Sequence, residues 1–367
     1  MSGSIYGNLF RISSWGESHG KGIGVVVDGC PAGLPLNEEI IQTYLNRRKP
    51  GTTKYSTPRK EDDIVEILSG VFEGKTTGTP ISMIVFNQTQ RSKDYSEIAG
   101  YYRPGHSDFT FDAKYGFRDY RGGGRSSGRE TIARVAAGAI ACTILKNLGI
   151  DVSAYTRSIG PISIDYSKCK KENIMKSPLY MPDIEASKKA EDFLWQKMTE
   201  QDSAGGIVEC IVTGMPSGIG DPSFEKLDAN LAKAIMSIGA VKGIEIGDGF
   251  HSSTATGSSN NDAFILDKNN HITKSSNHAG GILGGISDGS EIILRAAFKP
   301  TPSISQMQKT VNKSNEEIEI SVKGRHDPII VPRAVVVVEA MTALTLVDAL
   351  FMNMSSRLDK IIEFYHH

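Results

Sequence analysis

Hydrophobic residues recur along the chain at two different spacings, and each spacing predicts its own kind of secondary structure. Short alternating or β-branched runs bounded by glycine predict strands. Apolar residues spaced three and four positions apart predict helices. The strand-like runs are GIGVVVDG, TPISMIVFN, GGIVECIVTGMPSGIG, SEIILRAAF and EEIEISVKG. The helical patterns cover residues 38–47, 131–148, 187–201, 224–238 and 334–351.

The order of these elements favours an α+β fold. Strands and helices do not alternate regularly and several strands look like hairpins, so we expect antiparallel sheets packed on helices rather than a parallel doubly wound sheet. Two helical patterns, ARVAAGAIACTIL and PRAVVVVEAMTALTLVDAL, are apolar on most faces. Both helices should therefore lie deep, between sheets or at a subunit interface. Their faint similarity suggests an internal duplication within one domain that spans residues 1–367.

Composition and charge describe an ordinary soluble chain. Of its 367 residues, 39% are hydrophobic and 23% charged, a balance that argues against disorder. The net charge is −1, so a basic cluster must be a local site rather than a global field. The most apolar stretch is interrupted by Glu339 and Asp348, and no secretory pattern opens the chain. We therefore expect a cytoplasmic protein that does not span a membrane.

The cysteines predict neither a disulfide framework nor a metal site. Cys30, Cys142, Cys169 and Cys210 lie far apart and form no C-x-x-C or zinc spacing. We expect them to be reduced and buried, and we expect no metal.

Charge and glycine gather in RGGGRSSGRET, residues 121–131. Ser127 and Glu130 have the spacing of a capping box, which predicts a helix that begins at Ser127. Arg125 and Arg129 would then lie at the positive end of the helix dipole, where arginine is unfavourable unless an anion is bound. The alternative is a solvated glycine-rich loop. No P-loop and no dinucleotide-binding fingerprint is present, so the predicted anion site is of another kind.

A further basic stretch and two loop histidines point to the same chemistry. Residues 47–60, RRKPGTTKYSTPRK, hold six basic residues and no acidic one, although such a run is also typical of a solvated face. His19 in GESHG and His106 in RPGHSD are bracketed by glycine or proline. Such loop histidines suit proton transfer at neutral pH, and a hydrogen-bonded structural role is the alternative. The motif KGRHDP places Asp327 before a proline turn.

In this order, the motifs resemble those of chorismate synthases. The similarity runs through GNLFRISSWGESHG, RRKPGT, RPGHSDFTFDAKYGFRDYRGGGRSSGRETIARVAAGA, GAVKGIEIGDGF, SNHAGGILGGISDG, LRAAFKPTPSI and VKGRHDP, and it covers nearly the whole chain. The resemblance implies a carbon–oxygen lyase of the shikimate pathway, which converts 5-enolpyruvylshikimate 3-phosphate to chorismate by 1,4-anti elimination of phosphate. It also implies a β-α-β sandwich and a homotetramer.

The resemblance further implies reduced FMN as the cofactor, without net redox change, and NADPH only as an indirect source of reducing equivalents. His106 would protonate or stabilise the reduced flavin, and His19 would assist phosphate departure as an acid. Asp327 would act with the flavin N5 in removing the ring proton. The flavin contacts implied by the family motifs are Arg125, Ser126, Ser127, Gly239, Ala240, Gly284, Lys299, Pro300, Thr301, Pro302, Ser303 and Arg325.

The resemblance assigns a second set of cations to the anionic groups of the substrate. These are Arg48, Lys54, Arg134 and Arg325, and the first two also match positions associated with NADP in the family. Lys54 stands where many members have arginine, which keeps the charge but loses the bidentate fork. Gly239 replaces a frequent amide side chain, and Pro302 replaces a frequent serine.

Two other functional classes remain open from the residues alone. A nucleic-acid-binding protein could use the basic stretches to follow phosphates, although the chain lacks a basic total and matches no common reader module. A flavin-storing or purely structural protein would bind FMN without consuming the substrate.

Overall fold

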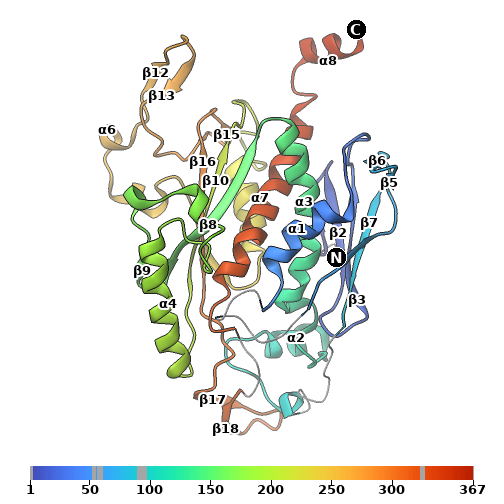
Figure 1. Cartoon of the computed structure of the whole chain (residues 1–367), viewed down its shortest axis with the longest axis vertical. Coiled ribbons are helices and arrows are strands. Elements are labelled where there is room, and N and C mark those ends of the chain that lie inside the picture. The colour runs from blue at the N-terminus through green and yellow to red at the C-terminus, as the bar shows by residue number, and fades with distance from the viewer. Residues whose placement is uncertain (1–2, 52–54, 56–60, 89–96, 323–326, 367) are drawn as a thin grey trace.

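The computed structural model describes residues 3–51, 55, 61–88, 97–322 and 327–366, and two five-stranded antiparallel sheets organise it (Figure 1). The first sheet has the order β1 (Ile5–Tyr6), β2 (Arg11–Gly16), β3 (Gly22–Asp28), β7 (Ile81–Phe86) and β4 (Val65–Ile67). The second has the order β11 (Val241–Ile246), β16 (Ile292–Phe298), β10 (Gly206–Thr213), β8 (Asp151–Ile159) and β9 (Ile162–Ser163). The predicted α+β class with antiparallel sheets is confirmed.

Four two-stranded hairpins and eight α-helices complete the described part of the chain. The hairpins are β5 (Val71–Phe72) with β6 (Lys75–Thr76), β12 (Phe264–Leu266) with β13 (Ile272–Lys274), β14 (Ile282–Leu283) with β15 (Ile286–Ser287), and β17 (Met307–Val311) with β18 (Glu317–Ser321). The helices are α1 (Glu38–Arg48), α2 (Asp108–Tyr115), α3 (Thr131–Asn147), α4 (Ile184–Thr199), α5 (Leu227–Met236), α6 (Gly257–Asn260), α7 (Val331–Asn353) and α8 (Leu358–Tyr365).

The two apolar helices α3 and α7 pack against each other, α3 against β3 and α7 against β8 and β10, so that they lie between the sheets (Figure 1). Both are buried along most of their length, as their sequences predict. They approach closely at Gly138, where a Cβ atom would lie 2.3 Å from the Cβ of Ala340. Only glycine allows this contact between the two backbones.

Helix α7 is long and apolar enough to cross a membrane, but 78% of its most apolar stretch is buried inside the protein. The sheet beside it shows why. The side chains of Val208, Cys210 and Val212 alternate along β10 toward the helices and are 0% exposed. The apolar surface of α7 is thus covered by protein, as in the core helix of a soluble domain.

The predicted helices agree with the observed ones to within three residues at each end. Strands β2 and β8 were missed, because their sequences RISSWG and DVSAYTRSI mix small and polar residues with few apolar ones. All four cysteines are free thiols, as predicted. The prediction that all four are buried is wrong for Cys169, which is half-buried, whereas the other three are buried.

Candidate functional site

The glycine- and arginine-rich segment leads into α3 through two short 3₁₀ turns, Gly124–Ser126 and Gly128–Glu130. The Ser127 hydroxyl accepts a hydrogen bond from the Arg129 N–H at 3.3 Å and so caps the second turn. The Glu130 carboxylate accepts from Arg134 Nε at 2.9 Å. The predicted capping box is therefore only half correct, and α3 itself begins at Thr131.

His19 lies directly against this segment. It follows β2, is 5% exposed, and its ring contacts the backbone of Gly122. A Cβ atom at Gly122 would lie 2.4 Å from Cδ2 and 2.5 Å from Nε2 of His19, and Gly122 has a φ of +68°. The Ser18 hydroxyl donates to the Gly122 carbonyl at 3.2 Å. Gly122 is thus needed both for its backbone conformation and for the space that His19 occupies.

His106 is held by hydrogen bonds at both ring nitrogens. Nδ1 lies 3.0 Å from the Pro104 carbonyl, and Nε2 lies 2.8 Å from the Ser303 hydroxyl. A carbonyl can only accept, so Nδ1 carries the proton and Nε2 of the neutral ring accepts from Ser303. Burial, reinforced by the positive charge of Arg103, lowers the pKa of His106 to about 4. In this state the ring is neutral at physiological pH.

The segment Lys299–Ser303 packs against the His106 loop. The Lys299 ammonium donates to the Gly105 carbonyl at 2.6 Å, and Pro302 Cβ lies 2.7 Å from where a Cβ of Gly105 would be. The Lys299 N–H donates to the carbonyl of Ala240, which adopts a left-handed φ of +71°.

Two hydroxyl contacts complete the assembly. The Ser107 hydroxyl donates to that of Ser126 at 2.9 Å, and the Ser203 hydroxyl donates to the Thr301 carbonyl at 2.7 Å. Pro300 packs against the backbone of Gly205. We call residues 104–107, 122–127, 239–240 and 299–303 the loop cluster, because these four segments meet here.

The loop cluster has the features that a phosphate-bearing cofactor requires. Within the described ranges the buried Thr301 hydroxyl has no hydrogen-bond partner, and such groups normally find one. Gly124 and Gly239 face open space, since a Cβ atom at either would meet nothing within 4 Å. Hydroxyls, a lysine and open glycine backbone together fit the phosphate of FMN.

The predicted arginines are already engaged by protein groups. Arg125 donates from Nη2 to the Ser14 hydroxyl at 2.6 Å and from Nη1 to the Gly16 carbonyl at 3.2 Å, both on β2. Arg134 pairs with Glu130 and donates from Nη1 to the Ser237 hydroxyl at 2.6 Å, which ties α3 to the end of α5.

Arg48 is buried in an ion pair, with Nη2 at 2.6 Å from the Asp63 carboxylate. Burial lowers the pKa of Arg48 to about 10, so the guanidinium stays charged at neutral pH. Arg129 Nη1 lies 3.1 Å from the same carboxylate and 3.7 Å from Glu61. Asp63 was not among the predicted site residues, and its only signal in the sequence is its position just after the basic run.

Asp327 lies beside the same group of side chains. Arg333 Nη1 donates to the Asp327 carboxylate, and Arg333 Nε donates to the Arg48 carbonyl at 3.0 Å. Two other predicted cations, Lys54 and Arg325, lie outside the described residues.

Gly284 is the one predicted residue that the described structure places elsewhere. The hairpin of β14 and β15 is joined to the start of α5 by a hydrogen bond from the Leu227 N–H to the Gly285 carbonyl. Gly239 and Ala240 follow the end of α5, a helix of ten residues, so about 15 Å separate the two regions.

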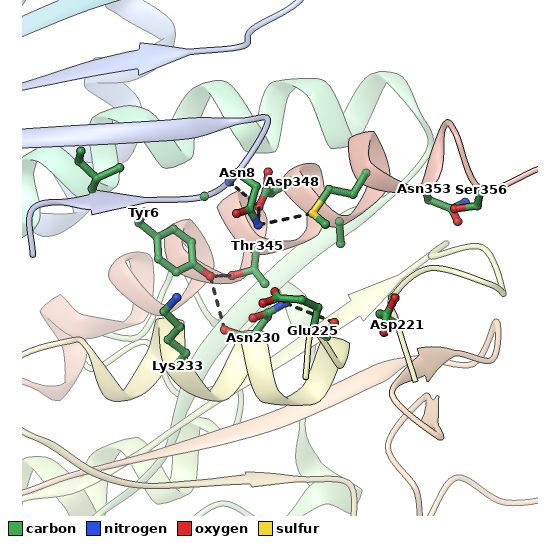
Figure 2. A pocket seen from close by; sticks show the side chains of 15 residues that line it. Tyr6, Asn8, Asp221, Glu225, Asn230, Lys233, Thr345, Asp348, Asn353 and Ser356 are labelled. Atoms are coloured by element: carbon green, nitrogen blue, oxygen red, sulfur yellow. Dashed lines mark hydrogen bonds between the residues drawn. The ribbon is translucent and has the colours of Figure 1, made fainter. Parts of the chain in front are cut away.

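A separate pocket opens between β1, α5 and α7, and Figure 2 shows it from close by. None of the predicted site residues lines it. Its polar groups pair with one another: Asp348 accepts from the backbone N–H groups of Leu9 and Phe10 at 2.7 and 3.0 Å, and the Tyr6 hydroxyl lies 2.7 Å from that of Thr345.

Comparison with known proteins agrees with the resemblance of the motifs. Residues 10–351 match the family model of chorismate synthase. The chain belongs to the chorismate synthase family. A chorismate synthase of Lachnoclostridium phytofermentans is 72% identical over 365 residues, which cover 100% of both chains. That of Methanosarcina mazei is 54% identical over 352 residues, 95% of this chain and 96% of that one.

Structural comparison gives the same family. A crystal structure of chorismate synthase matches with a TM-score of 0.77 at 31% identity, and covers 98% of this chain and 97% of that one. The chain is a carbon–oxygen lyase that forms chorismate from 5-enolpyruvylshikimate 3-phosphate, and its family requires a reduced flavin.

Proposed function

We propose that the loop cluster binds reduced FMN and that the substrate lies between the flavin, His19 and Asp327. The observation that carries this proposal is the junction of His106 with Ser303 and of Ser107 with Ser126, which joins three segments of the sequence around open glycine backbone. When bound, the reduced flavin supplies electron density to the substrate and recovers it. FMN contacts then come from Arg125, Ser126, Ser127, Gly239, Ala240, Lys299, Pro300, Thr301, Pro302, Ser303 and Arg325, whereas Gly284 lies in the hairpin at the other end of α5.

In this proposal His106 would protonate or stabilise the reduced flavin. The ligand-free ring is neutral, with Nε2 as an acceptor. A negative charge placed beside it raises the pKa of a histidine, so His106 would hold a proton when an anionic group is bound next to it. The protonated ring would then donate a hydrogen bond to that anion.

His19 and Asp327 act on the substrate itself. His19 is buried against Gly122, which fixes the ring and excludes water from one side, as a general acid for the departing phosphate requires. Asp327 is oriented by Arg333 and would take the ring proton, next to the bound flavin. The anionic groups of the substrate are met by Arg48, Lys54, Arg134 and Arg325.

Turnover under controlled redox conditions tests the cofactor. Purified protein, with FMN reduced chemically under anaerobic conditions, should convert 5-enolpyruvylshikimate 3-phosphate to chorismate. Oxidised FMN should give no product, and NADPH should support turnover only together with a separate reductase. Turnover without any flavin would contradict the proposal, and so would product formed with NADPH and FMN by the protein alone.

A nucleic-acid-binding role is the alternative that a binding assay can exclude. The buried pairing of Arg48 and Arg129 with Asp63 leaves these two arginines unavailable to a phosphate backbone at the surface. Binding to generic DNA should therefore lack the steep dependence on salt that phosphate tracking produces.

We further propose a cytoplasmic homotetramer whose subunit is a single β-α-β sandwich. The contacts of α3 with β3 and of α7 with β8 support the sandwich. The hairpin of β12 and β13 supports assembly, because Phe264, Leu266 and Ile272 are 64%, 63% and 77% exposed, and such apolar patches mark interaction sites. Light scattering should give about four times the chain mass of 39.7 kDa, and a monomer in solution would contradict it.

A further inference from the structure

Asp63 joins two arginines that come from different basic segments. One carboxylate oxygen lies 2.6 Å from Arg48 Nη2, at the end of α1, and the other lies 3.1 Å from Arg129 Nη1, in the turn before α3. The Asp63 side chain is 0% exposed. The Asp63 carboxylate therefore contacts the two arginines and has no surface open to solvent, from which a ligand would approach.

The backbone of Asp63 is held in an unusual conformation for this contact. Its φ is +47°, in the left-handed region that aspartate tolerates better than most residues. Gln42 on α1 fixes the neighbourhood, donating to the Asp63 carbonyl at 3.3 Å and accepting from the Val65 N–H at 3.1 Å. Such conformations persist where surrounding structure enforces them, and they are frequent at functional sites.

Both arginines keep unused N–H groups although they are buried. Arg48 is 1% exposed and Arg129 is 6% exposed. Within the described part of the chain, Arg48 Nε and Arg129 Nη2 have no hydrogen-bond partner. Arg129 Nη1 also lacks a hydrogen bond there, although it lies 3.1 Å from the Asp63 carboxylate. Two other donors are satisfied: Arg48 Nη1 reaches the Gly128 carbonyl at 3.1 Å, and Arg129 Nε reaches Asn87 at 2.9 Å. Unsatisfied buried donors are rare in proteins, and a bound anion would satisfy them.

We propose that Asp63 is a positioning residue for substrate binding, which holds Arg48 and Arg129 in register so that their unused N–H groups serve one anionic substrate. The inference rests on the proposed role of Arg48 toward 5-enolpyruvylshikimate 3-phosphate. Asp63 itself never touches the substrate. It acts by fixing the direction of two guanidinium groups and by compensating their charge until the substrate arrives.

The neighbouring residue on α1 offers a matched control. Arg47 forms a largely buried ion pair with Glu339, through two contacts of 2.6 and 2.8 Å. Glu339→Gln and Asp63→Asn each remove one buried carboxylate charge from an arginine of the same helix turn. Both variants should lose thermal stability, because each leaves a buried cation uncompensated.

The two variants should differ in their kinetics. We expect Asp63→Asn to raise KM for the substrate about ten-fold while kcat changes less than about three-fold, the signature of lost ground-state binding. Calorimetric Kd of the substrate without flavin should rise by the same factor. Glu339→Gln should leave KM within about two-fold of wild type. Equal KM values for Asp63→Asn and Glu339→Gln would overturn the inference.

Two further variants keep the test decisive. If Asp63→Asn does not fold, Asp63→Glu retains the charge but displaces the oxygens by one methylene, and KM should rise about three-fold; a wild-type KM would overturn the inference. Arg48→Lys tests the proposed function separately. An unchanged KM in Arg48→Lys contradicts the substrate role of Arg48, whereas a raised KM there with a normal KM in Asp63→Asn refutes only the role of Asp63.

Discussion

The loop cluster and the pocket of Figure 2 are both polar regions of one chain, yet their polar groups differ in how they are satisfied. The pocket gathers three carboxylates, those of Asp221, Glu225 and Asp348, and one cation, Lys233. The carboxylate of Asp348 accepts hydrogen bonds from three backbone N–H groups of the chain itself. The loop cluster presents Lys299 and the unpartnered hydroxyl of Thr301.

This difference teaches that a hollow alone does not indicate a ligand site. Two anionic molecules, FMN and the substrate, would meet repulsion at the carboxylates of the pocket. The loop cluster offers the positive charge of Lys299 and a Thr301 hydroxyl that has no partner among the described residues. We therefore expect the pocket to serve stability and the loop cluster to serve binding, and substitutions should separate these two roles.

The largest effect is expected at His106. His106→Ala should lower kcat by about 10²- to 10³-fold, because it removes a proton-transfer group held next to the flavin. His278→Ala is the control, since His278 is likewise paired, with Asp248 at 2.7 Å, but lies outside the loop cluster. Anaerobic assays with reduced FMN should show wild-type rates for the control, and an unchanged rate for His106→Ala would remove His106 from the mechanism.

Gly122→Ala should have the next largest effect. The added Cβ would overlap the ring of His19, so we expect kcat to fall at least about ten-fold as the acid is displaced. Gly116→Ala has a similar left-handed φ, +80°, but open space around its Cβ. It bears the same backbone strain, roughly 1 kcal/mol, and should keep full activity. If both variants lose activity equally, strain rather than contact with His19 is responsible.

Asp348→Asn, in the pocket, should lower stability and leave activity unchanged, unlike the two substitutions in the loop cluster. Three backbone N–H groups, those of Asn8, Leu9 and Phe10, donate to its carboxylate, so the loss of charge should destabilise the protein by about 1–3 kcal/mol. Denaturant unfolding measures this change. Because no residue of the loop cluster lines the pocket, kcat and KM should stay at wild-type values, and a large kcat defect in folded protein would place the pocket in catalysis.

The smallest effect is a pH dependence of stability. The pKa of His106 falls from an ordinary 6.5 to about 4 in the folded state, chiefly because the ring is buried. Between these values the unfolded chain binds a proton that the folded protein does not, so stability falls as pH falls from 6.5 toward 4. In His106→Gln, the melting temperature should fall less steeply than in the wild type as the pH is lowered over this range. Identical slopes in the two proteins would contradict the lowered pKa.

The sequence predicted the local structure of the helices well, because apolar spacing and capping act within a few neighbouring residues. The helix over residues 131–148 was observed as Thr131–Asn147. Strand β8 was missed, since its identity depends on pairing with β10, whose residues lie about 50 positions or further along the chain, from Ile159 with Gly206 to Asp151 with Thr213. The arrangement around Gly122 was missed for the same reason, because His19 lies more than one hundred positions earlier.

By itself, the sequence determined the family, the chemistry of its loops and the extent of its helices, since motifs and periodicity are properties of consecutive residues. The tertiary structure decided which charged side chains form ion pairs within the protein and which remain available to ligands. Arg47 and Arg48 are adjacent, yet one pairs with Glu339 on α7 and the other with Asp63 beside α1. Electrostatic pairing depends on distance in space, and only the packed layers bring these distant carboxylates within reach.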